Sequence, residues 1–241
     1  MQPMRYLSVI IGIGLCGGTF AQGLIIHDPN VVERKVKGYH AISVSNAIDL
    51  FLSQGGEEAV AVSAADVKWR DRIKTEVENG VLKIFLDQRG WIWGGGNKRM
   101  RVYVSFDTLD KLTASGACDI YVEGVIRGGN LVIDLSGASD FKGAVQLNGL
   151  TVYQSGASDT HFSGVVKGVT AVELSGASNL KGYDLETDQC VAYASGVSNV
   201  RITVNKELRA HASGASGVYY KGEPVVREAR ARGASSVSKK G

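Results

Sequence analysis

A short motif, Ser-Gly-Ala-Ser-Asp or a close variant, recurs along the chain from residue 115 and restricts its fold more than any other feature. The seven copies have their glycines at Gly116, Gly137, Gly156, Gly176, Gly196, Gly214 and Gly233. Successive glycines are 21, 19, 20, 20, 18 and 19 residues apart. A fixed period near twenty residues is typical of a solenoid. Because a coil of that length cannot bury its own apolar face, the copies are expected to stack on one another.

Aligning the copies on their glycines sorts the other residues into inward and outward columns. The positions four before and four after the glycine are mostly apolar and are predicted to face inward, as at Ile133 and Phe141. The position three before it is outward by the period of two in a strand. It holds Thr113, Asp134, Tyr153, Glu173, Tyr193 and His211. The pattern predicts an all-β fold, a parallel β-helix that the crossover rule makes right-handed.

The motif itself reads as a corner between two strands. Glycine supplies a backbone angle that other residues resist, and serine and alanine are expected because neighbouring coils leave little room. The residues that follow are Asp119, Asp140, Asp159, Asn179 and Asn199. They suit Asx turns that bond their own backbone two residues on. Calcium shared between stacked carboxylates is the alternative.

The region 22–106 is predicted to be β-rich, and 107–241 to be the β-helical part. Asn79-Gly80 separates two strand-like runs and predicts a two-residue hairpin. A short helical turn is expected within 66–73, a strand over 100–106, and an edge pairing near 31–36.

The first 21 residues resemble a secretory leader, with an apolar run after Arg5 and small residues ending at Ala21. The run is shorter than the about 20 residues that span a membrane. Cleavage after Ala21 predicts an exported protein, periplasmic, on the cell surface or extracellular. Lipidation at Cys16 is an alternative left open. The mature chain then carries no transmembrane segment.

Cleavage leaves two cysteines, Cys118 and Cys190, which belong to different coils. With coils stacked at about 4.8 Å, they lie roughly 19 Å apart along the axis. A disulfide requires Cα atoms within about 7 Å. Two free, buried thiols are therefore expected.

Known chemical motifs fit the repeat poorly. Ser139 and Lys142, like Ser178 and Lys181, spell S-x-x-K, but that nucleophile motif requires a helix. The four histidines have no zinc-ligand spacing. The net charge of +3 and the lack of aromatic-basic interleaving disfavour a nucleic-acid partner. No metal, cofactor or catalytic residue is predicted.

Two groups of residues are candidates for binding. The first is the outward column, in which Asp134, Tyr153, Glu173, Tyr193 and His211 form a strip suited to sugar contact. The second is the pair Trp91 and Trp93 in a glycine-rich loop, which either binds a partner or caps the open end of the solenoid. A polysaccharide lyase or glycoside hydrolase is the catalytic alternative, since Asp134 and Glu173 share the column two coils apart, roughly 10 Å.

Several segments together resemble the head GIN domain family of auto-transporter adhesins, known from secreted proteins of Bacteroidetes. They are residues 38–44, residues 75–84 with the Asn-Gly turn, the Ser-Gly-Ala-Ser series, and residues 220–224. The resemblance covers about residues 31–241. It implies an exported β-helical domain with an adhesive role toward a glycan or a cell-surface protein, and no catalytic residues. The last copy departs from the pattern, because Arg232 replaces serine and Arg227 and Arg230 precede it, as in a polar solenoid cap.

Overall fold

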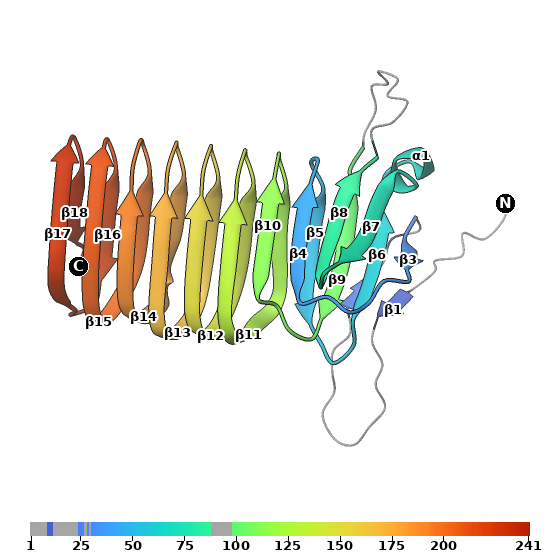
Figure 1. Cartoon of the computed structure of the whole chain (residues 1–241), viewed down its shortest axis with the longest axis horizontal. Coiled ribbons are helices and arrows are strands. Elements are labelled where there is room, and N and C mark those ends of the chain that lie inside the picture. The colour runs from blue at the N-terminus through green and yellow to red at the C-terminus, as the bar shows by residue number, and fades with distance from the viewer. Residues whose placement is uncertain (1–8, 12–23, 27, 29, 88–97) are drawn as a thin grey trace.

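A computed structural model of the chain describes residues 9–11, 24–26, 28, 30–87 and 98–241. Almost all described elements are strands, and most belong to one continuous sheet that is wound into a solenoid (Figure 1). Among these residues no helix has the length and apolar character needed to cross a membrane. The fold is therefore the all-β solenoid that the repeat predicts.

The repeat region forms the longer part of the solenoid, and each coil pairs in parallel with the next (Figure 1). Its strands are β10 (Lys111–Ser115), β11 (Asp119–Leu135), β12 (Asp140–Gln154), β13 (Asp159–Leu174), β14 (Asn179–Ala194), β15 (Asn199–Gly214), β16 (Gly217–Lys221), β17 (Val225–Gly233) and β18 (Ser236–Lys239). The long strands bend around a coil and end at the next corner. Stacking thus converts a local repeat into one long core.

The N-terminal region extends the same sheet. Its elements are β3 (Val32–Arg34), β4 (Ala41–Ser45), β5 (Asp49–Gln54), β6 (Ala59–Ser63), α1 (Val67–Arg70), β7 (Ile73–Glu78), β8 (Val81–Leu86) and β9 (Arg101–Phe106). Strands β4 and β5 pair in parallel with β10 and β11 on one side, and with β8 and β9 on the other. The chain therefore first forms the coil of β4 and β5, and then the coil of β8 and β9 on its N-terminal side. It then crosses to the other side of the first coil, where the repeats begin.

The local predictions for this region are confirmed. Strands β7 and β8 form an antiparallel hairpin, and Asn79 and Gly80 at its turn have φ values of 50° and 76°. The Asp66 side chain accepts a hydrogen bond from the Lys68 backbone N–H and caps α1. Strand β3 pairs with β6, which confirms the edge pairing near residues 31–36. Strand β9 corresponds to the strand predicted over residues 100–106.

The first 26 residues are described only in part. Strands β1 (Val9–Ile11) and β2 (Leu24–Ile26) form a separate antiparallel pair. Most of the predicted leader, including its cleavage site and Cys16, lies outside the described residues. Export through that leader stays a prediction.

The inward columns are confirmed as the core. Ile133, Val152 and Ala192, four residues before their glycines, are buried, and so are Ile120, Phe141 and Leu180 after them. Cys118 and Cys190 are free and buried, as expected from their separation. Complete burial raises the pKa of the Cys190 thiol to about 12. The two cysteines therefore serve as small apolar core residues.

The second serine of each corner is a structural group. Ser139, Ser158 and Ser178 are fully buried. Their hydroxyls donate to the carbonyl oxygens three residues back, at 3.0, 3.2 and 2.9 Å. These bonds close the corner from inside, so the serine hydroxyls are not available as nucleophiles.

The prediction that crowding keeps the corner alanine small is wrong. Ala138, Ala157 and Ala177 are exposed, and Val197 at the same position is 61% exposed. The close approach between coils is made by the glycine, because an added Cβ at Gly156 would overlap the Gly137 carbonyl oxygen. Backbone contact between corners, not side-chain crowding, fixes the motif.

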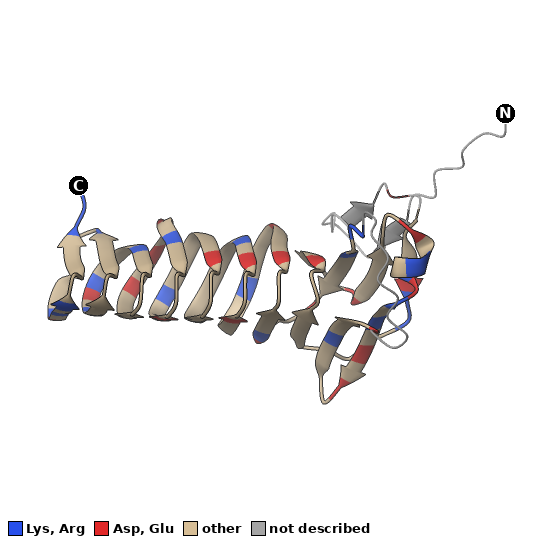
Figure 2. Ribbon diagram, turned by 90° about the horizontal axis from the view of Figure 1, so that it is seen from above, with Lys and Arg blue, Asp and Glu red and all other residues tan. Residues whose placement is uncertain are grey.

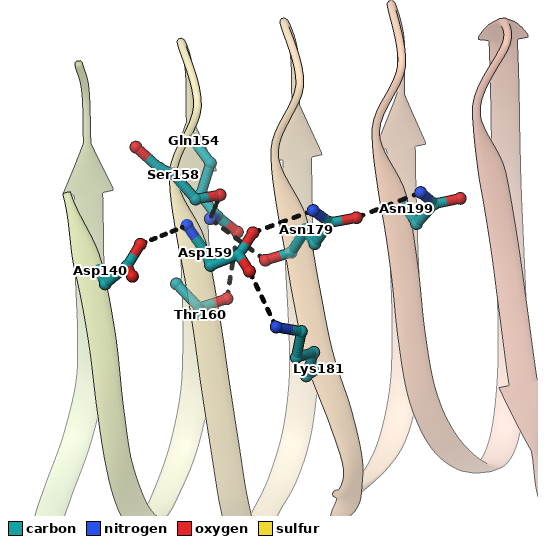
Figure 3. A network of polar contacts seen from close by, with 8 residues as sticks. All are labelled: Asp140, Gln154, Ser158, Asp159, Thr160, Asn179, Lys181 and Asn199. Carbon is teal, nitrogen blue, oxygen red and sulfur yellow. Dashed lines mark hydrogen bonds and ion pairs between the residues drawn. The ribbon is translucent and has the colours of Figure 1, made fainter. Parts of the chain in front are cut away.

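The prediction of local Asx turns is also wrong, because the Asp and Asn side chains bond to neighbouring coils instead (Figure 3). Asp140 accepts from the Asp159 backbone N–H at 3.0 Å. Asn179 donates to Asp159 at 2.9 Å, and Asn199 donates to Asn179 at 3.1 Å. Because the carboxylate or amide sits at the same height in each coil, the coil beside it is the nearer partner. The column therefore links coils together.

One buried polar residue interrupts an apolar column. Gln154 is paired in register with Leu135 and Leu174 and is 2% exposed. Its amide donates to the Ser158 carbonyl at 2.9 Å and accepts from the Thr160 hydroxyl at 3.1 Å (Figure 3). Both ends of the amide are thus satisfied inside the coil.

Replacing Gln154 by leucine is expected to lower the free energy of unfolding by about 1–3 kcal/mol, because the Thr160 hydroxyl loses its buried acceptor. Urea denaturation measures the change. The double variant Gln154→Leu with Thr160→Val removes both polar partners and is expected to regain part of the loss. Equal stability of the single variant and the wild type would contradict the assigned network.

Candidate functional site

The outward column predicted from the sequence is a continuous ladder on one side of the solenoid. The register pairs Thr113 with Asp134, then Tyr153, Glu173, Tyr193, His211 and finally Arg230 in consecutive coils. This ladder runs along the strands that end at the corners, on the side that faces the viewer in Figure 1. Residues far apart in sequence thus lie in one row. We call this row the ladder.

Small side chains border the middle of the ladder on both sides, whereas Arg209 and Arg232 border its C-terminal end. The column two residues before it holds Val132, Thr151, Ala171 and Val191. The column two residues after it holds the corner serines Ser136, Ser155, Ser175, Ser195 and Ser213. The larger ladder side chains therefore stand above a flat surface, where an extended molecule can reach them.

The aromatic members of the ladder are well exposed. Tyr153 is 44% and Tyr193 is 49% exposed, and Glu173 between them is also exposed. The two tyrosines are two coils apart, roughly 10 Å. Tyr193 stacks on His211 with ring centroids 4.9 Å apart and ring planes 13° apart.

An open depression of about 550 Å³ lies at the C-terminal end of the ladder. Glu173, Tyr193, His211, Arg230 and Arg232 contribute to its lining. The depression combines a carboxylate, an aromatic ring and two guanidinium groups. These groups can bind hydroxyls, an apolar sugar face and an anion, respectively.

The arrangement is a poor acid and base pair. Asp134 and Glu173 are separated by the coil that carries Tyr153, and both stand on the flat surface described above. Glycoside hydrolases need two carboxyl groups flanking one bond, about 5–9.5 Å apart. In the described ranges, no group of three or more His, Cys, Asp or Glu side chains could hold a metal ion.

The opposite side of the solenoid carries a second outward column. Tyr103, Phe51 and Tyr121 stack there with centroid distances of 5.1 and 5.3 Å. The register continues this column through Lys142, His161, Lys181, Arg201 and Tyr219. Lys181 pairs with Asp159 at 2.8 Å. Burial opposes ionisation of Asp159, but the bonds from Lys181 and Asn179 keep its pKa below the usual value.

The structure brings together five of the predicted binding residues, Asp134, Tyr153, Glu173, Tyr193 and His211. Trp91 and Trp93 lie outside the described residues. The sequence pattern predicts only a polar cap at Arg230 and Arg232, whereas in the structure both border the depression. The signal was present in the sequence, because Arg232 stands where six other corners carry serine.

Solved structures share this fold. One is described as a "putative adhesin" from Bacteroides fragilis NCTC 9343, with a TM-score of 0.76 and 18% identity over 87% of this chain and 96% of that chain. Another is described as a "putative lipid binding protein" from Parabacteroides distasonis ATCC 8503, with a TM-score of 0.69 and 18% identity over 88% and 96% of the two chains. At this identity the likeness shows the fold alone. No curated protein matches the chain.

The family model described as "Putative auto-transporter adhesin, head GIN domain" matches residues 38–224. The match begins just before β4 and ends just before β17. It therefore spans most of the solenoid and most of the ladder. The chain belongs to this head GIN domain family of auto-transporter adhesins.

Proposed function

We propose that the protein is an exported, non-catalytic adhesin module that binds an extended glycan along the ladder. The observation that carries the proposal is the row of exposed Tyr153, Glu173 and Tyr193 in register on a flat surface. Family membership supports the adhesive role. Export rests on the leader predicted at residues 1–21.

A glycan fits this surface better than a globular protein does. The tyrosines recur at two coils, roughly 10 Å, which is close to the repeat of a disaccharide in an extended chain. Tyrosine offers an apolar ring together with a hydroxyl, and Asp134 and Glu173 offer acceptors for sugar hydroxyls. Protein interfaces instead centre on apolar cores from which water is excluded.

The geometry of the carboxylates supports the non-catalytic part of the proposal. Asp134 and Glu173 flank a tyrosine instead of a shared bond, and the flat surface around them does not exclude water. A reducing-sugar release assay with any bound glycan is expected to show no turnover. Turnover that is lost in Asp134→Ala or Glu173→Ala would overturn the non-catalytic assignment.

Removing the ladder tyrosines is expected to weaken glycan binding. Tyr153→Ala and Tyr193→Ala each remove an exposed ring and hydroxyl, and a loss of roughly tenfold in affinity is expected for each. A glycan array identifies ligands, and isothermal titration calorimetry measures the variants.

Tyr121→Ala is the matched control, because Tyr121 is 40% exposed on the opposite side of the solenoid. Its affinity is expected to equal that of the wild type. Loss of binding in Tyr121→Ala, with full binding in both ladder variants, would place the site on the side opposite the ladder and contradict the proposal.

A further inference from the structure

The C-terminal end of the ladder differs in charge from the rest of it. Arginine and lysine bands gather on the terminal coils (Figure 2). Arg230 continues the ladder after His211, and Arg232 continues the serine column after Ser213. Because they are two residues apart on β17, both side chains leave the strand on the same face. They border the depression that Tyr193 and His211 also line.

After the local ion pairs are formed, guanidinium groups in the depression remain able to bind an anion. Glu228 faces two bases, since its carboxylate lies 2.7 Å from Arg230 and 3.4 Å from His211. Arg230 remains 63% exposed. Arg232 is exposed, and within the described part of the chain its guanidinium has no ion-pair partner.

The backbone of Arg232 is held in place without its side chain. Its N–H donates to the Ser235 hydroxyl at 2.8 Å, and that hydroxyl donates to the Arg232 carbonyl at 2.8 Å. The corner is therefore closed as in the other coils, and the guanidinium is not needed for it. Protection of an edge strand accounts for charge on β17. It does not account for one arginine in the ladder and a second in the serine column beside it.

We propose that this depression selects glycans that carry a carboxylate, with Arg230 and Arg232 binding the carboxylate and Tyr193 the sugar ring beside it. The inference rests on the proposed function and narrows its ligand class to acidic sugars such as uronates. A guanidinium presents parallel N–H donors that match the two oxygens of a carboxylate. Glu173, three coils from Arg230, accepts hydroxyls of the following sugars.

The test compares acidic oligosaccharides with their carboxyl-reduced forms. Tetrasaccharides of galacturonic, glucuronic and mannuronic acid are titrated into the wild-type protein beside the same oligomers reduced to primary alcohols. At least one acid is expected to bind about 10 to 100 times more tightly than its reduced form, as for hydrogen bonds to a charged group.

The variant Arg232→Ser restores the residue found in the six other corners, so the fold is expected to be unchanged. It is expected to lose most of the preference for the acid and to keep the affinity for the reduced oligomer. Arg201→Ser, on the opposite side, is the matched control and is expected to keep both affinities.

The outcomes separate the two proposals. Equal binding of acid and reduced oligomers, or an unchanged preference in Arg232→Ser, overturns the acidic-sugar inference and leaves glycan binding in place. The acidic-sugar inference is also overturned if Arg201→Ser, and not Arg232→Ser, loses the preference for the acid. Failure of the wild type to bind any glycan, on these probes and on an array, overturns the proposed function itself.

Discussion

Gly156→Ala is expected to lower the free energy of unfolding by about 3 kcal/mol or more, the sum of a left-handed backbone penalty and overpacking. Gly156 has φ of +79°, and an added Cβ would overlap the carbonyl oxygen of Gly137 in the adjoining coil. That oxygen also accepts the hydrogen bond from Ala157 at 2.7 Å. The methyl group therefore acts against both the corner and the stacking of two coils.

Gly129→Ala is the matched control within the same solenoid. An added Cβ at Gly129 meets nothing within 4 Å, and its φ is not positive. Urea denaturation is expected to show little change for this variant. A Gly156→Ala protein as stable as Gly129→Ala would contradict the close backbone contact between corners.

Phe162→Ala is expected to cost about 3–5 kcal/mol, the usual range for deleting a buried aromatic ring. Phe162 is fully buried and packs against Phe141, with ring centroids 4.8 Å apart. The stack leaves space for these rings by placing Gly143 as the register partner of Phe162. Removing the ring therefore leaves a cavity in a close-packed core.

Val165→Ala, in the same strand, serves as the control because Val165 is 41% exposed. Chemical denaturation of both variants is expected to show a large loss for Phe162→Ala and a loss below about 1 kcal/mol for Val165→Ala. Comparable losses in the two variants would contradict the assignment of Phe162 to the inside and Val165 to the outside of β13.

The repeats could be predicted because stacking imposes the same constraint on every coil. Each of the seven motif glycines, the first at Gly116 and the last at Gly233, has a positive φ, and the columns counted from them divide correctly into core and surface. The sequence count nevertheless misses one corner. Ser45-Asn46-Ala47-Ile48-Asp49 stacks on the Gly116 corner, with φ of 71° at Asn46 and 57° at Ala47. Asparagine tolerates the left-handed region, so the motif persists without its glycine.

The order of coils in the N-terminal region could not be read from the sequence. The coil of β4 and β5 lies between that of β8 and β9 and the first repeat, so neighbours in space are not neighbours in the chain. Periodicity identifies strands but not which coil they join. The boundary placed at residue 106 stays a prediction.

One part of the candidate site could be predicted from the sequence and another part could not. The ladder was predictable, because an outward column needs only the repeat and the period of two. The depression was not, since it depends on how Arg230 and Arg232 of the last coil adjoin Tyr193 and His211. A single arginine in a serine column signals a difference but not its partners.

The most direct test of the binding assignment is a crystal structure of the protein with the oligosaccharide that binds it most tightly. The ligand is predicted to lie along the ladder, with sugar rings at Tyr153 and Tyr193 and a carboxylate between Arg230 and Arg232. A ligand bound along the opposite column, from Tyr121 to Arg201, would contradict the assignment.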